Sequence, residues 1–211
     1  MNSPRPAAAL FDMDGTLVDS TASVAHCWTE VALHYGLDPV EIVRVSHGVR
    51  AVDTVRKYLP ESEVLVAVGL LEEWELGFLD GIVPMPGAVE YLSRLEDLAV
   101  PVAVVTSASE ALAHSRFAAA GIRLPEVLVA AHHVSRGKPA PDGYLLAAEQ
   151  LGVRAADSVV FEDAEAGLQA GTAAGARVVV VGSWISPTTD RLERIHDYRE
   201  LLADPARDPF A

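Results

Sequence analysis

Apolar residues gather along this chain in short, nearly continuous runs that alternate with longer segments of helical periodicity. Five of the short runs are rich in Val, Leu or Phe and lack a clean apolar–polar alternation. A strand that helices cover on both faces is apolar throughout, so these runs predict buried parallel strands. They are AALFDMD (8–14), PVAVVTS (101–107), EVLVAA (126–131), SVVFED (158–163) and RVVVVG (177–182).

The segments that separate the last four strands have the periodicity of helices. Residues 109–121, 142–152 and 164–175 each run to a glycine, which is a common helix stop. Strands that alternate with helices predict an α/β fold, here a doubly wound, Rossmann-like parallel sheet with right-handed crossovers. We expect the stretch 183–205 to form a loop and a short amphipathic helix.

The segment after the first strand differs, because residues 18–82 have the pattern of helices only. We therefore expect an all-helical cap at 18–82, inserted into a core that comprises residues 1–17 and 83–211. Ligands of α/β proteins bind beyond the carboxyl ends of parallel strands, so a helical insert at this point is placed to act as a lid. Its apolar faces are Val24, Trp28, Val31 and Tyr35 in one helix and Val64, Val68, Leu71, Trp74 and Phe78 in another.

The composition restricts the class of protein. Half of the 211 residues are hydrophobic, which is ample for a folded core. The 16 Lys and Arg against 30 Asp and Glu give a net charge of −14, which argues against nonspecific nucleic-acid binding. The apolar runs are too short for a membrane span, the first residues lack a signal-peptide pattern, and the single cysteine cannot form an intrachain disulfide. We expect a cytoplasmic monomer without membrane or nucleic-acid partners.

Two aspartates mark the end of the first predicted strand. In FDMDGT, Asp12 and Asp14 are two positions apart, so both side chains can point the same way before Gly15 turns the chain. Two carboxylates in one pocket repel, and a cation or protonation of one of them relieves that cost. A carboxylate can also act as a nucleophile in phosphoryl transfer. The alternative is an ordinary turn, since Asp and Gly are common turn residues.

Hydroxyl side chains follow the second predicted strand. Thr106 and Ser107 precede a helix whose first N–H groups are free to bind an anion. A structural alternative is a capping box that runs from Ser107 to Glu110. Capping and phosphate binding are compatible for neighbouring residues, so both remain candidates, with Thr106 first.

A lysine and an acidic pair complete the set of polar residues near strand ends. Lys138, one of two lysines in the chain, precedes a proline that favours an extended backbone, and its compact charge suits a phosphate. The alternative is a solvated loop lysine, with Asp142 as the cap of the next helix. Glu162 and Asp163 end a very apolar strand and suit Mg²⁺, which prefers a few carboxylate oxygens plus water. A helix N-cap would also account for Asp163.

These four groups converge on one edge of the sheet, and their order resembles the haloacid dehalogenase-like hydrolase superfamily. FDMDGTLVDS is similar to its first motif, TS to its second, Lys138 to its third and EDAEAG to its fourth. The resemblance covers nearly the whole chain, because residues 18–82 lie where that family carries a type 1 cap.

The resemblance implies a role for each of the matched residues. Asp12 would attack the substrate phosphorus and become an aspartyl-phosphate, while Asp14 would act as general acid and then as general base. Thr106 and Lys138 would hold the phosphoryl oxygens. Mg²⁺ would be bound by Asp12, by Asp163 and by the carbonyl oxygen of Asp14. Glu162 would be a further or water-mediated ligand.

The cap then bears on the substrate. HGVRAVDT is similar to a cap loop of sugar- and polyol-phosphate phosphatases, in which His47, Gly48 and Arg50 would face a small phosphorylated metabolite. We expect Arg56 and Lys57 to face water. A β-phosphoglucomutase-like phosphomutase is the alternative, but such mutases carry a cap histidine where this chain has Val24. A non-catalytic metabolite-binding module is a further alternative, against which the intact acidic residues argue. The physiological substrate is not read from the sequence.

Overall fold

The core of the molecule is a six-stranded parallel sheet. The computed structural model describes residues 5–211, and in it the strands pair in the order β5-β4-β1-β6-β7-β8. The central strand β1 pairs with β4 on one side and with β6 on the other, with Phe11 opposite both Val104 and Phe161. The strand bounds are β1 (Ala9–Phe11), β4 (Val102–Val105), β5 (Val127–Val129), β6 (Val159–Glu162), β7 (Arg177–Val181) and β8 (Glu193–Ile195).

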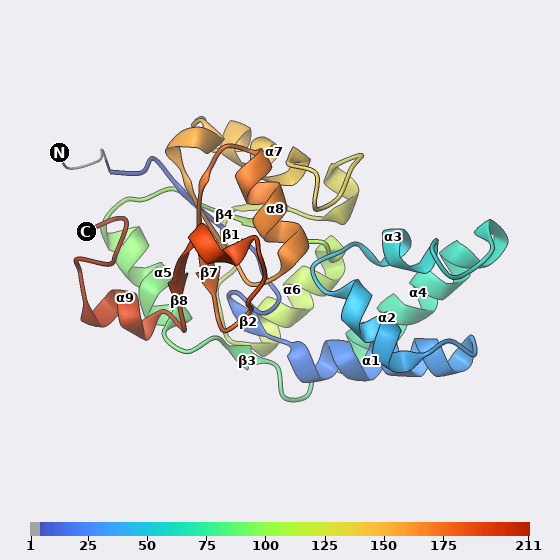
Figure 1. Cartoon of the computed structure of the whole chain (residues 1–211). Coiled ribbons are helices and arrows are strands. Elements are labelled where there is room, and N and C mark those ends of the chain that lie inside the picture. Colours follow the sequence, from blue (N-terminus) through green and yellow to red (C-terminus); the bar gives the residue numbers. More distant parts are fainter. Residues whose placement is uncertain (1–4) are drawn as a thin grey trace.

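Helices cover both faces of this sheet, which confirms the predicted α/β class (Figure 1). One face packs against α5 (Ala88–Asp97), α6 (Glu110–Ala119) and α9 (Arg199–Ala203), and the other against α7 (Asp142–Gln150) and α8 (Glu165–Ala173). Aromatic rings dominate the first layer, where the rings of Phe11 and Phe161 stack with centroids 4.7 Å apart. A buried core of this kind fixes the carboxyl ends of β1 and β6 side by side.

Four helices form a separate group beside the sheet, on the right of Figure 1. They are α1 (Thr21–His34), α2 (Pro39–Ser46), α3 (Ala51–Val55) and α4 (Glu61–Gly77). The group has its own buried cluster, which includes Trp28 and Val31 of α1 and Val64 and Leu71 of α4. The apolar faces expected in this segment therefore pack against each other rather than against the sheet.

The helix ends agree with the glycine pattern but correct two expectations about caps. Helices α6, α7 and α8 are each followed by a glycine at positive φ, which only glycine adopts without strain. Helix α6 is capped by Ser109, whose Oγ accepts from the backbone of Leu112, so the capping box from Ser107 is wrong. Asp142 is the first residue of α7 rather than its N-cap, and it pairs with Arg136.

Short strands account for the remaining differences between sequence and structure. Residues 18–82 were expected to be helical throughout, but β2 (Val18–Asp19) pairs with β3 (Val83–Pro84) where the helical group leaves the sheet. The stretch 183–205 contributes the edge strand β8 as well as the expected helix α9. Among residues 5–211, no helix is long and apolar enough to cross a bilayer.

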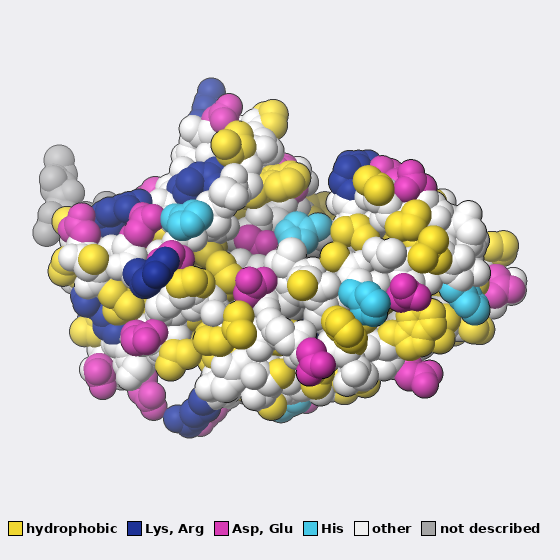
Figure 2. All heavy atoms as spheres, turned by 90° about the horizontal axis from the view of Figure 1, so that it is seen from below, with side chains coloured by type: hydrophobic (Ala, Val, Ile, Leu, Met, Phe, Trp, Pro, Cys, Tyr) yellow, Lys and Arg dark blue, Asp and Glu magenta, His cyan; other side chains and the backbone are white. Residues whose placement is uncertain are grey.

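The surface carries the acidic excess of the chain in scattered form. Figure 2 shows acidic side chains spread among basic and apolar ones on the face that it presents. Histidine and acidic side chains come to the surface at the hollow between the sheet and the helical group. The chemistry expected from the sequence lies in that region.

Candidate active site

The site lies at the carboxyl ends of three neighbouring strands. Asp12 follows β1, Thr106 follows β4 and Asp163 follows β6, and these strands are adjacent in the order β4-β1-β6. Parallel strands end at one edge, so residues far apart in sequence meet there. Lys138 reaches the same place from the loop before α7 and contacts Asp12 directly. The structure thus brings together the four groups singled out in the sequence.

Lys138 is a buried positive charge of the site, rather than a solvated loop lysine. Its Nζ donates to Asp12 and, at 2.6 Å, to Oε1 of Glu162. Burial opposes its charged form, yet the carboxylates of Asp12 and Glu162 raise the pKa of Lys138 above its ordinary value. An ammonium whose charge these two carboxylates favour therefore lies beside the candidate nucleophile.

Glu162 holds this lysine from behind. Its Oε1 also accepts from the hydroxyl of Tyr144 at 3.0 Å, and its Oε2 accepts from the backbone N–H groups of Asp163 and Ala164, each at 3.0 Å. Both oxygens are thus hydrogen-bonded, and the residue is fully buried. A Cβ at Gly167 would lie 1.5 Å from Oε1, so only glycine leaves room for this carboxylate.

Three carboxylates share the site and perturb one another. Burial, reinforced by the charge of Glu162, raises the pKa of Asp12 well above its ordinary value, while Lys138 opposes that rise. Burial also raises the pKa of Asp163, and the hydrogen bond with His47 opposes that rise. Such a concentration of buried negative charge is unfavourable unless a cation compensates it.

The same carboxylates fit a hard divalent cation. Oxygens of Asp12, Glu162 and Asp163 all lie within 4.8 Å of one another. A set of carboxylate oxygens suits Mg²⁺, which takes few protein ligands and retains water. Because both oxygens of Glu162 already accept hydrogen bonds, Asp12 and Asp163 are the better placed of the three to bind the ion directly.

A second group of potential ligands, Glu110, His132 and His133, lies on the surface. The Nδ1 atom of His133 accepts a hydrogen bond from the backbone N–H of Ala130 at 3.0 Å. A neutral imidazole that accepts at Nδ1 carries its proton on Nε2, so that nitrogen has no lone pair for a metal. This group is therefore a poor metal site.

Asp14 has a different environment from the other carboxylates. Its Oδ1 accepts from the hydroxyl of Ser20 at 2.5 Å, and its Oδ2 accepts from Nη1 of Arg116 at 2.8 Å. Nη2 of Arg116 donates to Glu75 of α4 at 2.9 Å. Sequence reasoning missed Arg116 and Glu75. The available signal was a charge on the apolar face of the helix at 109–121, one turn after Leu112.

The hydroxyl residues after β4 divide into two environments. The Oγ1 of Thr106 accepts from the backbone N–H of Ala108 at 3.0 Å, beside the start of α6. The hydroxyl of Ser107 instead donates to the carbonyl oxygen of Gly48 at 3.0 Å. Thr106 therefore faces the sheet edge, whereas Ser107 links that edge to the helical group.

The loop from His47 to Arg50 crosses the site. Nε2 of His47 lies 3.0 Å from Oδ2 of Asp163, and this contact raises the pKa of the imidazole. Gly48 has a φ of 72°, and a Cβ there would lie 2.6 Å from that of Ala164, so the loop approaches α8 as closely as glycine permits. The structure thus places this loop against Asp163, a candidate metal ligand.

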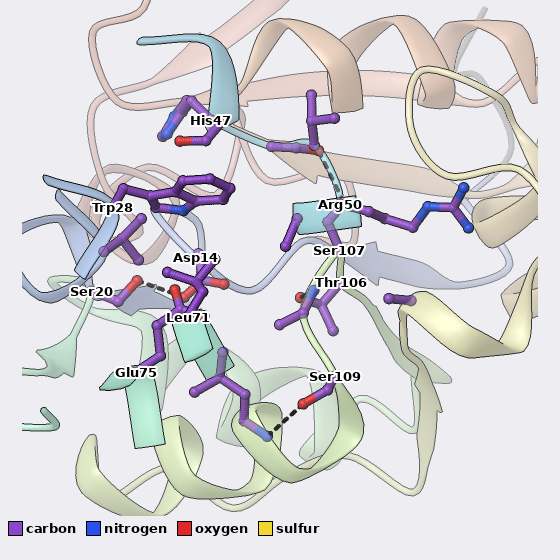
Figure 3. A pocket seen from close by; sticks show the side chains of 18 of the residues that line it. Asp14, Ser20, Trp28, His47, Arg50, Leu71, Glu75, Thr106, Ser107 and Ser109 are labelled. Atoms are coloured by element: carbon purple, nitrogen blue, oxygen red, sulfur yellow. Dashed lines mark hydrogen bonds between the residues drawn. The ribbon is translucent and has the colours of Figure 1, made fainter. Parts of the chain in front are cut away.

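Arg50 is engaged by protein groups on both sides of this loop. Its Nε donates to Asp53 at 2.6 Å, and Nη1 donates to the carbonyl oxygen of Val134 at 3.2 Å. Figure 3 shows its guanidinium directed away from Asp14. Arg56 and Lys57 are exposed, as expected, and Arg56 pairs with Glu61 at the surface.

A cavity of about 240 Å³ lies between the sheet edge and the helical group. Asp12, Asp14 and Thr106 line its floor on the sheet side, and Trp28 and Leu71 belong to its apolar wall. In Figure 3 Ser20, Trp28, Leu71 and Glu75 gather around Asp14. The site can therefore hold a small ligand with an anionic group at Asp12 and a larger part against the helices.

Comparisons with known proteins agree with this arrangement. A family model described as haloacid dehalogenase-like hydrolase matches residues 6–175. Hexitol phosphatase A of Escherichia coli K12 is 42% identical over 177 residues, which is 82% of this chain and 82% of that protein. The 2-deoxyglucose-6-phosphate phosphatase 1 of Saccharomyces cerevisiae is 34% identical, over 82% of this chain and 79% of its own. A β-phosphoglucomutase structure from Clostridium difficile, 19% identical with 97% of each chain covered, has a TM-score of 0.85, which shows a shared fold.

Proposed function

This chain belongs to the haloacid dehalogenase-like hydrolase family, and we propose that it is a Mg²⁺-dependent phosphatase of small sugar or polyol phosphates. The observation that carries the proposal is the contact of Lys138 with Asp12 at the floor of the cavity, with Asp14 lining the same space. In this proposal Asp12 is the nucleophile and Asp14 the acid in one cavity, and Lys138, bonded to Asp12, is the cation that binds the phosphate.

In the first step, a carboxylate oxygen of Asp12 attacks the phosphorus of the substrate. The bond from phosphorus to the sugar or polyol oxygen breaks, and Asp14 gives its proton to that oxygen, so that an alcohol leaves and an aspartyl-phosphate remains on Asp12. Lys138 and Thr106 bind the phosphoryl oxygens in this proposal. Positioning and neutralisation of charge supply most of the catalysis in such transfers.

In the second step, water attacks the phosphorus of the aspartyl-phosphate. Asp14, now a carboxylate, takes a proton from that water, and the bond between phosphorus and Asp12 breaks to release phosphate. Both steps use the same acid–base residue, which is in its starting state again at the end. The hydrogen bonds from Ser20 and Arg116 to its two oxygens support the proposal that Asp14 is held for this task.

The metal site is proposed to use Asp12 and Asp163 through their carboxylates and Asp14 through its backbone carbonyl. Bound Mg²⁺ would supply positive charge that neutralises the phosphoryl oxygens and orients them for attack. Glu162 is proposed to support the site without binding the metal directly. One of its oxygens accepts a hydrogen bond from Lys138, and the other accepts hydrogen bonds from two backbone N–H groups.

We propose that residues 18–82 form the cap that selects the substrate. The apolar wall of Trp28, Leu71 and Val24 faces a cavity of about 240 Å³, a size that suits a small phosphorylated metabolite. In this proposal His47, which contacts Asp163, and Gly48 border the reaction centre, and Arg50 contacts the substrate when its guanidinium leaves Asp53 and the carbonyl oxygen of Val134. The names of the relatives, a hexitol phosphatase and a 2-deoxyglucose-6-phosphate phosphatase, support sugar or polyol phosphates as the class.

A phosphomutase on the same fold is the alternative. The residue at the mutase histidine position is Val24, an apolar lining residue of the cavity. His26 is exposed and its ring packs on Phe78, with centroids 4.3 Å apart. These placements favour hydrolysis over intramolecular return of the phosphoryl group. The expectations of a monomer and of a cytoplasmic location remain proposals; size-exclusion chromatography tests the first.

Phosphate release from a panel of sugar, polyol and nucleotide phosphates, assayed with Mg²⁺, tests the proposed function. Free phosphate from a hexitol or hexose phosphate supports a phosphatase, whereas an isomeric hexose phosphate from a hexose 1-phosphate indicates a mutase. Asp12→Asn removes the nucleophile with little change in shape and should abolish turnover. Substantial turnover by that variant would refute the role of Asp12.

A further inference from the structure

Arg116 is a buried arginine that joins the candidate acid to the helical cap. It projects from α6 of the core, and only 2% of its surface is exposed. Nη1 donates to Oδ2 of Asp14 at 2.8 Å, and Nη2 donates to Oε1 of Glu75, in α4, at 2.9 Å. Neither residue belongs to the motifs that carry the family resemblance, so their pairing calls for a separate explanation.

Arg116 and its two carboxylate partners stabilise one another's charges. Burial disfavours its charged form, but the carboxylates of Asp14 and Glu75 raise the pKa of the guanidinium above its ordinary value. Burial raises the pKa of Glu75, and the charge of Arg116 opposes that rise. Nε of Arg116 has no hydrogen-bond partner within residues 5–211, so the two carboxylates are what hold the guanidinium.

The carboxylate of Asp14 is fixed at both of its oxygens. Ser20, just before α1, donates to Oδ1. Arg116, in α6 of the core, donates to Oδ2. The side chain of Asp14 remains 27% exposed toward the cavity, whereas that of Arg116 behind it is 3% exposed. Arg116 also lines the cavity, but it is almost fully covered, so Asp14 is the more exposed of the two to a substrate.

We propose that Arg116 is a positioning residue that sets the orientation of Asp14 for proton transfer, and that Glu75 completes this support when the cap lies over the sheet. The proposal rests on the phosphatase function given above. A guanidinium is planar and presents its N–H groups in a fixed geometry, so it can hold two carboxylates at once. The position of the acid is thereby linked to the position of α4.

The link has a defined consequence for the reaction. When the phosphorus–oxygen bond breaks, a sugar or polyol oxygen needs the proton of Asp14, because an alkoxide is a poor leaving group. A 4-nitrophenolate is a good leaving group and departs without that proton. A misplaced acid therefore impairs the transfer from an alkyl phosphate and spares the transfer from an aryl phosphate.

The test compares Arg116→Met with the wild-type protein on two substrates, a hexitol phosphate and 4-nitrophenyl phosphate, both with saturating Mg²⁺. The ratio kcat/KM is used because it covers the steps up to release of the alcohol or phenol. We expect kcat/KM for the hexitol phosphate to fall by about 100-fold, as a misplaced catalytic group can cause, and that for the aryl phosphate by less than about threefold. Arg123→Met is the matched control, because Arg123 is exposed and, among residues 5–211, pairs only with Glu96 at the surface.

Equal falls for both substrates in a folded Arg116→Met protein would overturn the proposal and leave Arg116 a purely structural role. Thermal unfolding establishes the folded state. If the single variant does not fold because Glu75 and Asp14 lose their counter-charge, Arg116→Met with Glu75→Met removes one of the two carboxylates and gives the same comparison. Absence of phosphate release by the wild-type protein would instead refute the phosphatase function itself, so the two failures are distinguishable.

Discussion

Nε2 of His47 lies 3.0 Å from Oδ2 of Asp163, so the proposed cap contacts the sheet edge at a proposed metal ligand. Two further contacts lie nearby. The hydroxyl of Ser107 donates to the carbonyl oxygen of Gly48, and Arg50 donates to the carbonyl oxygen of Val134. The loop that approaches the reaction centre is thus tied to the core along its length, and substitutions in it should separate binding of the metal from binding of the substrate.

Replacement of His47 should weaken the metal site. A hydrogen bond from a neighbouring imidazole orients a ligating carboxylate, and loss of such a partner typically lowers metal affinity by about 10-fold or more. We expect His47→Ala to raise the Mg²⁺ concentration for half-maximal activity by about 10-fold, with little change in kcat at saturating Mg²⁺. His26→Ala is the control, since His26 is an exposed cap histidine outside the cavity. An unchanged Mg²⁺ requirement in His47→Ala would refute the proposal that His47 orients Asp163 for metal binding.

Replacement of Arg50 should change KM by an amount that depends on whether the substrate has a sugar or polyol group for the cap to contact. If Arg50 contacts the sugar or polyol, Arg50→Ala raises KM for a sugar phosphate by about 10-fold, the cost of roughly one charged hydrogen bond, and raises KM for an aryl phosphate less. Steady-state kinetics on both substrates measure the difference. Arg56→Ala serves as the control, because Arg56 is exposed and its side chain bonds only with Glu61 within the described part of the chain. Equal rises in KM would mean that Arg50 only holds the loop against the core.

The positions of Asp12, Thr106, Lys138 and Asp163 were predictable because each follows, or lies near, a strand that is apolar on both faces. The sequence marks such strands clearly, and adjacent parallel strands place their carboxyl ends together. Strand β8 was not predictable in the same way. It is three residues long and includes Glu193 and Arg194, which lie on an edge strand with less buried surface.

Contacts that depend on the packing of one helix group on another were also hidden. Arg116 meets Glu75 and Asp14 although these residues are 41 and 102 positions away, and no local pattern encodes that meeting. The contact exists because α4 lies against α6. The same reason applies to His47, whose partner Asp163 is 116 positions away. Long-range side-chain pairs require the three-dimensional arrangement, whereas buried strands do not.

Removal of divalent cations should abolish turnover and also lower stability. Three buried carboxylates lie close together, and burial raises the pKa of Asp12 and Asp163, so their ionised forms are unfavourable without added positive charge. A cation that binds only the folded protein stabilises it by about 2.7 kcal/mol at 100 times its Kd. We expect chelation to lower Tm by several degrees and Mg²⁺ to restore it. In Asp163→Asn the shift on adding Mg²⁺ should largely disappear, and a full shift in that variant would contradict the ligand assignment.

Substitution of Gly167 should displace Lys138 indirectly, through Glu162. A Cβ at this position would lie 1.5 Å from Oε1 of Glu162, the oxygen that accepts from Lys138 and Tyr144, so Gly167→Ala forces the carboxylate to move. Overpacking of this kind costs about 1–3 kcal/mol of unfolding free energy, and the displaced ammonium should raise KM for every phosphate ester alike. Gly69→Ala is the matched control, because a Cβ in that helix meets nothing within 4 Å and should stabilise the protein by about 0.5–1 kcal/mol. Denaturant unfolding and steady-state kinetics measure both variants, and normal kinetics in Gly167→Ala would show that Glu162 does not need its present position to hold the lysine.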